Sequence, residues 1–199
     1  MLCYFPALFL GLFDLDEGAF AATSLQMIKQ NQYLVPYIGE ELRLEKPILT
    51  YWIQAISMSI FGANEFALRI PSVIASFFWG FYFADFVKRY IKNSSRSEIF
   101  LNLLTIPGIF IISFAATADA LLNLFITLLM ISLFDYSERK EDRFLIRSGI
   151  FVALGFLVKG LTIIALGGMV ALLYFIYQRK LRIFFSIILS WKAWLAFII

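Results

Sequence analysis

The sequence contains no histidine and a single cysteine, Cys3, and each scarcity excludes a class of site. Without histidine, the chain lacks the side chain that most often acts as a general base near neutral pH and as a zinc ligand. A lone cysteine excludes an intramolecular disulfide. Charged residues make up only 16% of the chain, and no basic run is dense enough to indicate nucleic-acid binding.

Apolar residues dominate what is present. The chain is 61% hydrophobic and 18% aromatic, and its mean hydropathy of +0.84 is far above that of soluble domains. The apolar residues form continuous runs rather than the strict alternation of a membrane β-barrel. We therefore expect an all-α, polytopic transmembrane helical bundle that forms a single membrane domain over residues 1–199.

Seven apolar segments define the expected spans. They are Leu2–Phe13, Phe66–Val87, Ile99–Ala116, Ala120–Phe134, Phe144–Val158, Leu161–Tyr177 and Ile183–Ile199. The first would form a helix of about 18 Å, which is shorter than the ~30 Å hydrocarbon core of a bilayer. The last stops inside an apolar run. We therefore expect a truncated gene product or a fragment of a longer protein.

Basic residues follow every second segment. Because cytoplasmic loops are enriched in Lys and Arg, the connections at 88–97, 138–147 and 179–182 are predicted to face the cytoplasm. The connections that hold residues 14–65, Asp119 and Lys159 are then extracytoplasmic. The ionisable residues outside the basic loops therefore gather mostly on one side of the membrane.

The long outer loop, residues 14–65, is predicted to contain two helices that lie on the membrane surface. Residues 18–30 carry a loose apolar stripe, and residues 47–61 begin with Pro47, which is favoured in the first turn of a helix. Tyr51 and Trp52 suit a position at the membrane interface. Such helices would cover a cavity formed by the spans.

Two charged motifs stand out in this loop: Asp16-Glu17, and Glu45-Lys46 followed by Pro47. Charges beside a membrane are costly to desolvate and usually serve a function. The Asp16 carboxylate could activate or orient a hydroxyl nucleophile, or it could cap a helix. Because proline disfavours helical geometry in the preceding residue, Lys46 is expected in extended or turn backbone, either bound to an anion or solvated.

Together the two motifs resemble the first extracytoplasmic loop of the polyprenyl-phosphate-dependent C-type glycosyltransferases. This group includes the protein O-mannosyltransferases and the lipid A aminoarabinose transferases. The chain departs from the family pattern at Phe20, where the family has tyrosine, and at Ile48, where it has a second proline. The resemblance extends from residue 14 to about residue 170, essentially the N-terminal half of a family member.

The resemblance implies roles for individual residues. It makes Asp16 and Asp119 the catalytic candidates, although Asp119 lacks the proline that follows in the family and could instead cap a helix, with Thr117 as a rival cap. It makes Lys46 and Lys159, which is followed by Gly160, the residues that bind the donor phosphate. A shared donor and acceptor would require these residues to line one cavity.

Three further residues are candidates for supporting roles. Glu17 and Glu45 are the acidic neighbours of the main candidates. In the aminoarabinose transferases the residue matching Glu45 can contribute to a metal site, but a site built from glutamate and histidine cannot close in a chain without histidine. No metal is therefore assigned. Arg69, which precedes Ile70-Pro71, is expected to be an anchor at the membrane interface rather than a site residue.

The function implied is transfer of a sugar from a polyprenyl-phosphate carrier to a lipid or protein acceptor. The site would face the periplasm or exterior, with the chain in the inner membrane of a bacterium, and the 199-residue chain is expected to be an incomplete or inactive fragment. The cofactor is the lipid-linked sugar donor, and no nucleic-acid partner is expected. The alternative is a multi-pass transporter or channel, against which stand the long outer loop and the lack of paired charges deep in the spans.

Overall fold

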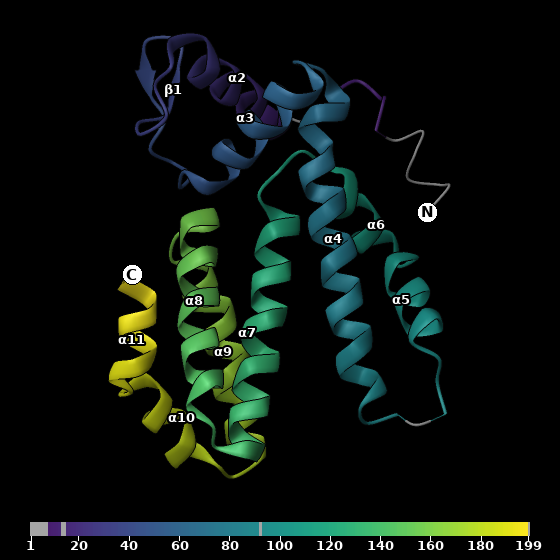
Figure 1. The fold of residues 1–199 in the computed structure, drawn as a ribbon, viewed down its shortest axis with the longest axis vertical. Helices are drawn as coiled ribbons and strands as arrows, with labels where there is room; N and C mark the ends of the chain where they lie inside the picture. Colours follow the sequence, from purple (N-terminus) through teal and green to yellow (C-terminus); the bar gives the residue numbers. More distant parts are fainter. Residues whose placement is uncertain (1–7, 13–14, 92, 199) are drawn as a thin grey trace. The chain divides into compact units, whose positions relative to one another are not determined.

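The computed structural model describes residues 8–12, 15–91 and 93–198. These fold into helices α2 (Leu15–Gln30), α3 (Leu49–Phe61), α4 (Glu65–Lys88), α5 (Arg96–Leu104), α6 (Pro107–Phe114), α7 (Asp119–Arg139), α8 (Asp142–Lys159), α9 (Thr162–Tyr177), α10 (Leu181–Ile188) and α11 (Trp191–Ile198). Strands β1 (Tyr37–Ile38) and β2 (Glu41–Leu42) form the one hairpin among the described residues (Figure 1). The prediction of an all-α helical bundle is confirmed.

The chain divides into two compact units, Met1–Leu121 and Leu122–Ile199. The first contains α2 to α6 and the start of α7, and the second contains the rest of α7 and α8 to α11. This division falls within the stretch predicted to form one membrane domain. Each unit is described by itself below.

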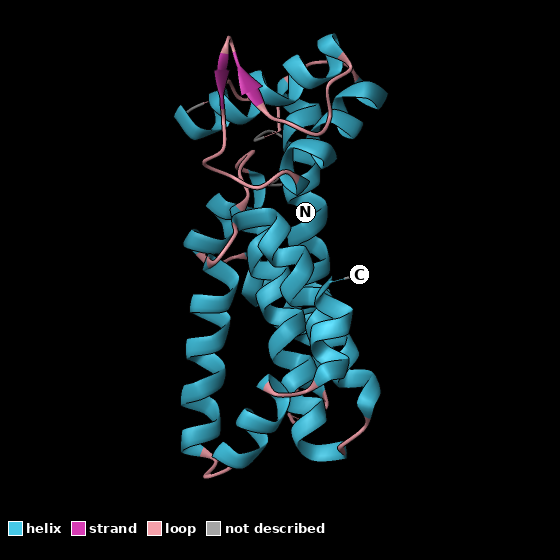
Figure 2. Ribbon diagram, turned by 90° about the vertical axis from the view of Figure 1, so that its left-hand side faces the viewer, coloured by secondary structure: helices cyan, strands magenta, loops and turns pink. Residues whose placement is uncertain are grey.

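The 14–65 loop contains the two expected helices, α2 and α3, with the hairpin between them (Figure 2). The strands pair antiparallel, with Tyr37 opposite Leu42 and Ile38 opposite Glu41. The turn between them requires a positive φ at Gly39 (64°), which glycine adopts without strain. The Gln26 side chain accepts from the Gly39 amide (2.9 Å) and donates to its carbonyl (2.7 Å), so the turn is fixed to α2.

Helix α4 crosses its proline without breaking. Pro71 has no amide hydrogen, so the carbonyl of Ala67 loses its normal partner in the helix. The hydroxyl of Ser57, on α3, donates to that carbonyl at 2.5 Å. The proline therefore gives α3 a polar attachment point on α4, beside the apolar cluster of Met58, Ala67, Leu68 and Ala116.

Two of the predicted apolar segments are broken. Residues 99–116 form α5 and α6, which meet at 79°, instead of one span. The break lies at Pro107, which holds Ile106 in extended backbone (φ −64°, ψ 122°). Residues 183–199 similarly contain α10 and α11, bent by 44°. Most of the expected segment Leu2–Phe13 lies outside the described residues, and its described part, 8–12, is not helical.

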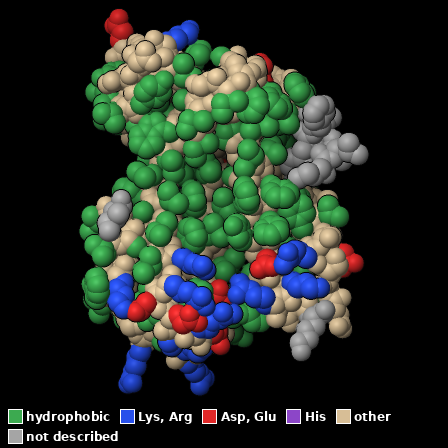
Figure 3. Space-filling view, viewed as in Figure 1, with side chains coloured by type: hydrophobic (Ala, Val, Ile, Leu, Met, Phe, Trp, Pro, Cys, Tyr) green, Lys and Arg blue, Asp and Glu red, His purple; other side chains and the backbone are tan. Residues whose placement is uncertain are grey.

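Among the described helices, α4 and α7 are each long and apolar enough to cross a membrane, and the count rises to four if each bent pair forms one span. Apolar side chains remain exposed along α4, including Ile74, Phe77 and Phe81. Figure 3 shows hydrophobic side chains covering much of the visible surface, while Lys and Arg gather near the connections between helices. This pattern suits helices surrounded by lipid.

Candidate functional site

The structure brings Asp16 and Lys46 together, although thirty residues separate them. The Lys46 ammonium nitrogen lies 3.9 Å from Oδ2 of Asp16, and the two side chains are 24% and 53% exposed. Both groups are therefore accessible to a ligand. Asp16 lies inside the first turn of α2, which begins at Leu15, rather than at the cap position before the helix. A carboxylate in this turn interacts favourably with the helix dipole.

Lys46 lies in a bend of the backbone, outside any helix, as the proline that follows it predicts. Helix α3 begins three residues later, at Leu49, and no side chain caps its first turn at Ile48. Glu45 is exposed beside Lys46. The lysine side chain therefore projects from a segment whose backbone geometry is restricted by Pro47.

Glu17, next to Asp16, points the other way, into the protein. Its Oε2 lies 3.2 Å from Nη2 of Arg69, and both side chains are completely buried. Arg69 also donates to the carbonyls of Leu10 (2.6 Å) and Gly11 (3.0 Å). The expectation that Arg69 anchors the protein at the membrane interface is wrong, because its guanidinium is enclosed by protein and neutralised by a carboxylate.

A second set of bonds fixes the segment between α6 and α7. Oε1 of Glu17 accepts from the amide of Ala116 at 2.6 Å, and the side-chain amide of Gln54 donates to the carbonyl of the same residue at 3.0 Å. The hydroxyl of Ser24 in turn donates to Gln54 (3.1 Å). Helices α2 and α3 are therefore both hydrogen-bonded to Ala116, which lies three positions before Asp119.

Asp119 is half-buried and is the first residue of α7. The hydroxyl of Thr117 donates to its Oδ2 at 3.2 Å and accepts from its amide at 3.5 Å. Thr117, one of the two rival caps, therefore engages the start of α7. Asp119 belongs to the same compact unit as Asp16 and Lys46, and the bonds through Glu17 and Ala116 connect their segments.

Lys159 belongs to the second compact unit, where it is the last residue of α8. The helix ends because Gly160 adopts a positive φ of 58° and donates its amide to the carbonyl of Phe156 (2.7 Å). Lys159 is half-buried at this end. Its place in a cavity shared with Asp16, Lys46 and Asp119 stays a prediction.

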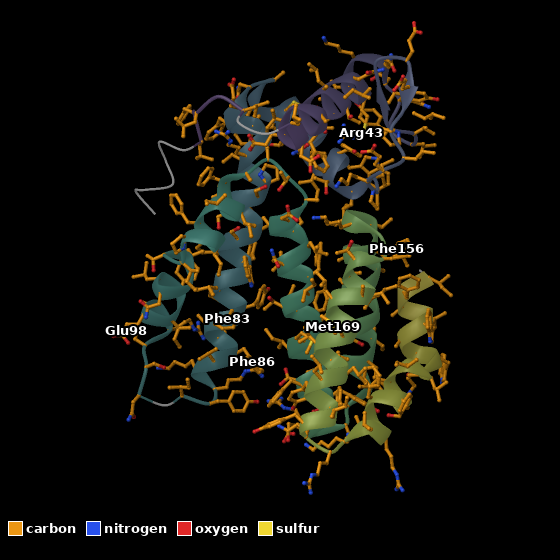
Figure 4. All side chains as sticks on the ribbon, turned by 180° about the vertical axis from the view of Figure 1, so that it is seen from behind. Arg43, Phe83, Phe86, Glu98, Phe156 and Met169 are labelled. Atoms are coloured by element: carbon orange, nitrogen blue, oxygen red, sulfur yellow. The ribbon has the colours of Figure 1, made fainter. Side chains whose placement is uncertain are left out.

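One residue near the site, Arg43, carried no signal in the sequence. It lies between β2 and α3, beside helix α2, and is labelled in Figure 4. Its Nε donates to the hydroxyl of Tyr51 (2.9 Å), and its guanidinium carbon lies 5.7 Å from the ring centre of Phe20. Arg43 is 8% exposed, Phe20 1% and Tyr51 0%. Its burial depends on contacts with two distant residues, which no local pattern encodes.

Tyr51 was expected at the membrane interface, and that expectation is wrong, because the ring is completely buried against Phe20. Burial raises the pKa of the Tyr51 phenol above its ordinary value, and the charges of Glu45 and Asp16 act in the same direction. The Arg43 guanidinium opposes them by favouring the ionised form. The phenol therefore stays protonated at physiological pH, within reach of the charges of Asp16 and Glu45.

A metal site has no support in the part of the chain that the structure describes. Within these residues, no group of three or more Asp, Glu, Cys or His side chains converges in a way that could hold an ion. Glu45 therefore has no cluster of co-ligands among the described residues.

Comparisons with known proteins place the chain in a family. The family model described as dolichyl-phosphate-mannose-protein mannosyltransferase matches residues 45–199. An undecaprenyl phosphate-alpha-4-amino-4-deoxy-L-arabinose arabinosyl transferase from Aeromonas hydrophila is 33% identical over 182 residues, which cover 85% of this chain and 32% of the relative. The protein of the same name from Wigglesworthia glossinidia brevipalpis is 31% identical over 163 residues, covering 78% of this chain and 28% of the relative.

Solved structures share the fold. The crystal structure of ArnT from Cupriavidus metallidurans bound to undecaprenyl phosphate aligns with a TM-score of 0.85 at 19% identity, over 99% of this chain and 37% of that one. Its apo form gives a TM-score of 0.80. The chain thus spans about a third of the length of the proteins it matches. The family model covers most of the chain, and the chain therefore belongs to the dolichyl-phosphate-mannose-protein mannosyltransferase family.

Proposed function

We propose that the chain belongs to a membrane glycosyltransferase that moves a sugar from a polyprenyl-phosphate carrier to the hydroxyl of a lipid or protein acceptor. The site lies on the extracytoplasmic side of the bacterial inner membrane. A lipid-linked donor suits residues that lie beside the apolar spans, because the phosphate of such a donor is held at the membrane surface. The names of the relatives support an undecaprenyl carrier and a pentose.

Asp16 and Asp119 act on the nucleophile in this proposal. An accessible carboxylate accepts the proton of the acceptor hydroxyl as its oxygen attacks the anomeric carbon of the sugar. The bond between that carbon and the phosphate oxygen breaks, and its electron pair stays on the phosphate. Lys46 stabilises the negative charge that develops there, and Lys159 is the second candidate for binding the phosphate.

The ion pair of Asp16 and Lys46 is the observation that carries the proposal. The separation of 3.9 Å supports the proposal, because a base and a cation this close together can act on one reacting group. The buried bonds of Glu17 to Arg69 and to the amide of Ala116 fix the first turn of α2, which carries Asp16. Glu17 and Arg69 therefore serve as supporting residues, whereas Glu45 contributes charge beside Lys46.

The test separates binding from transfer, because the chain spans about a third of its relatives. Binding of polyprenyl phosphate is measured on the chain in nanodiscs. Transfer of labelled sugar is measured in proteoliposomes that hold the longest protein containing this sequence. Asp16→Asn keeps the size of the side chain but removes the base, so it should abolish transfer and leave carrier binding largely intact.

Lys46→Ala should instead weaken carrier binding, because it removes the counter-charge of the phosphate. Lys29→Gln is the matched control, since Lys29 lies on α2 in its last turn, away from Asp16. Full transfer by Asp16→Asn would reduce Asp16 to a structural role. Carrier-independent passage of a solute through the reconstituted protein would favour the transporter alternative.

A further inference from the structure

Arg43 is a buried cation beside the proposed site. The residue is 8% exposed, its Nε donates to the hydroxyl of Tyr51 at 2.9 Å, and its guanidinium carbon lies 5.7 Å from the ring centre of Phe20. The Nε donor is satisfied by Tyr51. The two terminal nitrogens of the fork carry the remaining four N–H donors, which suit the oxygens of a phosphate or carboxylate.

No carboxylate among the described residues lies within ion-pair distance of Arg43. The other buried arginine of the described chain, Arg69, shows the usual arrangement, with Glu17 3.2 Å away. Burying a cation without a counter-charge is unfavourable by several kcal/mol, and one contact with a phenylalanine ring offsets about 1–2 kcal/mol. Arg43 is therefore suited to bind an anion that comes from outside the chain.

Arg43 lies close to the ion pair of Asp16 and Lys46. Phe20, under the guanidinium, is four residues after Asp16 in α2, so the two side chains lie on the same helix face, about 5–6 Å apart at their Cβ atoms. The phenol of Tyr51, bonded to Arg43, also experiences the charges of Asp16 and Glu45. Arg43 and Lys46, which belong to the same loop, therefore both lie near Asp16.

A transfer reaction beside Asp16 increases the negative charge on the phosphate, so a second cation near Lys46 would stabilise the product. The phosphodiester of a lipid-linked sugar carries one negative charge. When the bond to the anomeric carbon breaks and the electron pair stays on the phosphate oxygen, the product is a phosphomonoester that carries up to two charges, with a second pKa near 6. The acceptor oxygen takes the sugar, and its proton passes to the carboxylate.

We infer that Arg43 is a second phosphate-binding residue that acts with Lys46 and favours the dianionic carrier over the monoanionic donor. This inference rests on the proposed function and deepens it. Lys46, already beside Asp16, offers a point charge, whereas the fork of Arg43 binds two phosphate oxygens in a fixed geometry. Tyr51 and Phe20 hold the fork in place, which lowers the entropic cost of binding.

The probe is a polyprenyl phosphate in nanodiscs of zwitterionic lipid, with the matching polyprenol as the uncharged control. Arg43→Gln should raise the dissociation constant for the phosphate by about thirtyfold or more at pH 8, where the monoester is a dianion. The loss should be smaller at pH 5, where the monoester carries one charge. Arg43→Lys keeps the charge without the fork and should show an intermediate loss. Polyprenol binding should not change.

Thermal unfolding distinguishes a ligand-binding arginine from a structural one. If Arg43 has no counter-charge in the free protein, Arg43→Gln should leave the melting temperature in phosphate-free nanodiscs unchanged or raise it. The increase in melting temperature that polyprenyl phosphate gives the parent chain should be lost. A lowered melting temperature without phosphate, together with a retained ligand-induced increase, would show a structural role and overturn the inference.

The pattern across variants separates this inference from the proposed function. Loss of binding in Lys46→Ala with unchanged binding in Arg43→Gln overturns the role of Arg43 alone. Unchanged binding in both variants overturns the phosphate site and the proposed function with it. Lys29→Gln, which removes an exposed charge at the far end of α2, should behave as the parent chain in every assay.

Discussion

Glu17 and Arg69 form an ion pair in which both side chains are completely excluded from solvent. The carboxylate bridges two elements, since one oxygen meets Arg69 on α4 and the other accepts from the amide of Ala116, between α6 and α7. A buried ion pair often stabilises a fold no more than apolar residues of similar volume, because desolvating both charges is unfavourable. This pair lies next to Asp16 in the chain, so it also fixes the direction of the first turn of α2.

This ion pair predicts strong coupling between its partners. Glu17→Leu or Arg69→Met alone should lower the free energy of unfolding by about 3–5 kcal/mol, because each leaves a buried charge without its partner. The double variant should lose much less than the sum. The measurement is a double-mutant cycle of unfolding in mild detergent.

The exposed pair of Arg96 and Asp85 provides the comparison. Its side chains are 50% and 41% exposed, so its loss should cost less than about 1 kcal/mol. Additive losses in the Glu17 and Arg69 cycle would contradict direct coupling between the two groups.

The hydrogen bond from Ser57 to α4 predicts that the loss of stability caused by Ser57→Ala depends on Pro71. Ser57→Ala should cost about 1–3 kcal/mol, because the carbonyl of Ala67 then lacks both the hydroxyl and the amide that proline cannot supply. In a Pro71→Ala background the restored amide can bond that carbonyl, so the same substitution should cost clearly less. Ser59→Ala is the control, since its hydroxyl bonds to Ala55 within an intact helix (2.8 Å).

Two glycines of the second unit predict opposite effects of alanine. A Cβ at Gly149, on α8, would clash with the backbone carbonyl of Ala193 on α11, whereas one at Gly168, on α9, would meet no atom within 4 Å. Gly149→Ala should therefore destabilise the protein by about 1–3 kcal/mol. Gly168→Ala should be neutral or stabilise it by up to about 1 kcal/mol. Thermal unfolding of both variants is the measurement, and equal effects would contradict close packing of α8 on α11.

Tyr51 predicts a loss of stability in alkali. Burial and the nearby carboxylates raise the pKa of its phenol in the folded chain. Above pH 10 the unfolded chain releases this proton first, so stability that is present below that pH should fall as pH rises. Tyr51→Phe should flatten the decline in melting temperature between pH 9 and pH 11. Tyr177→Phe, at a residue 85% exposed, should leave the decline unchanged.

The basic connections predict the orientation of the chain. In a Cys3→Ser background, an impermeant thiol reagent applied from outside should label Gln32→Cys in the outer loop but not Asn93→Cys between α4 and α5. Both positions are exposed, so the side of the membrane decides the labelling. The reverse pattern would overturn the assigned topology and the extracytoplasmic site.

The sequence alone determined the helical class of the protein, the presence of both helices in the outer loop, and the non-helical backbone of Lys46 before Pro47. Each depends on information within a few residues: a continuous apolar run, a helix-favouring start, or the restriction that Pro47 places on its neighbour. The local effect of Pro107 was also present in the sequence, but the predominantly apolar, uncharged composition of residues 99–116 favoured a single span over the 79° break. Family resemblance, not periodicity, directed attention to Asp16 and Lys46.

Only the tertiary structure decided which charges are buried and what they contact. Glu17 meets Arg69 across 52 positions and Ala116 across 99, and no pattern of period 2 or 3.6 encodes such pairs. For the same reason, the sequence does not distinguish Arg43 from other polar loop residues, whereas in the structure Arg43 contacts Phe20 and Tyr51. Whether a charged side chain is solvated, paired or ready to bind an anion depends on the surfaces that folding brings around it, and those come from distant parts of the chain.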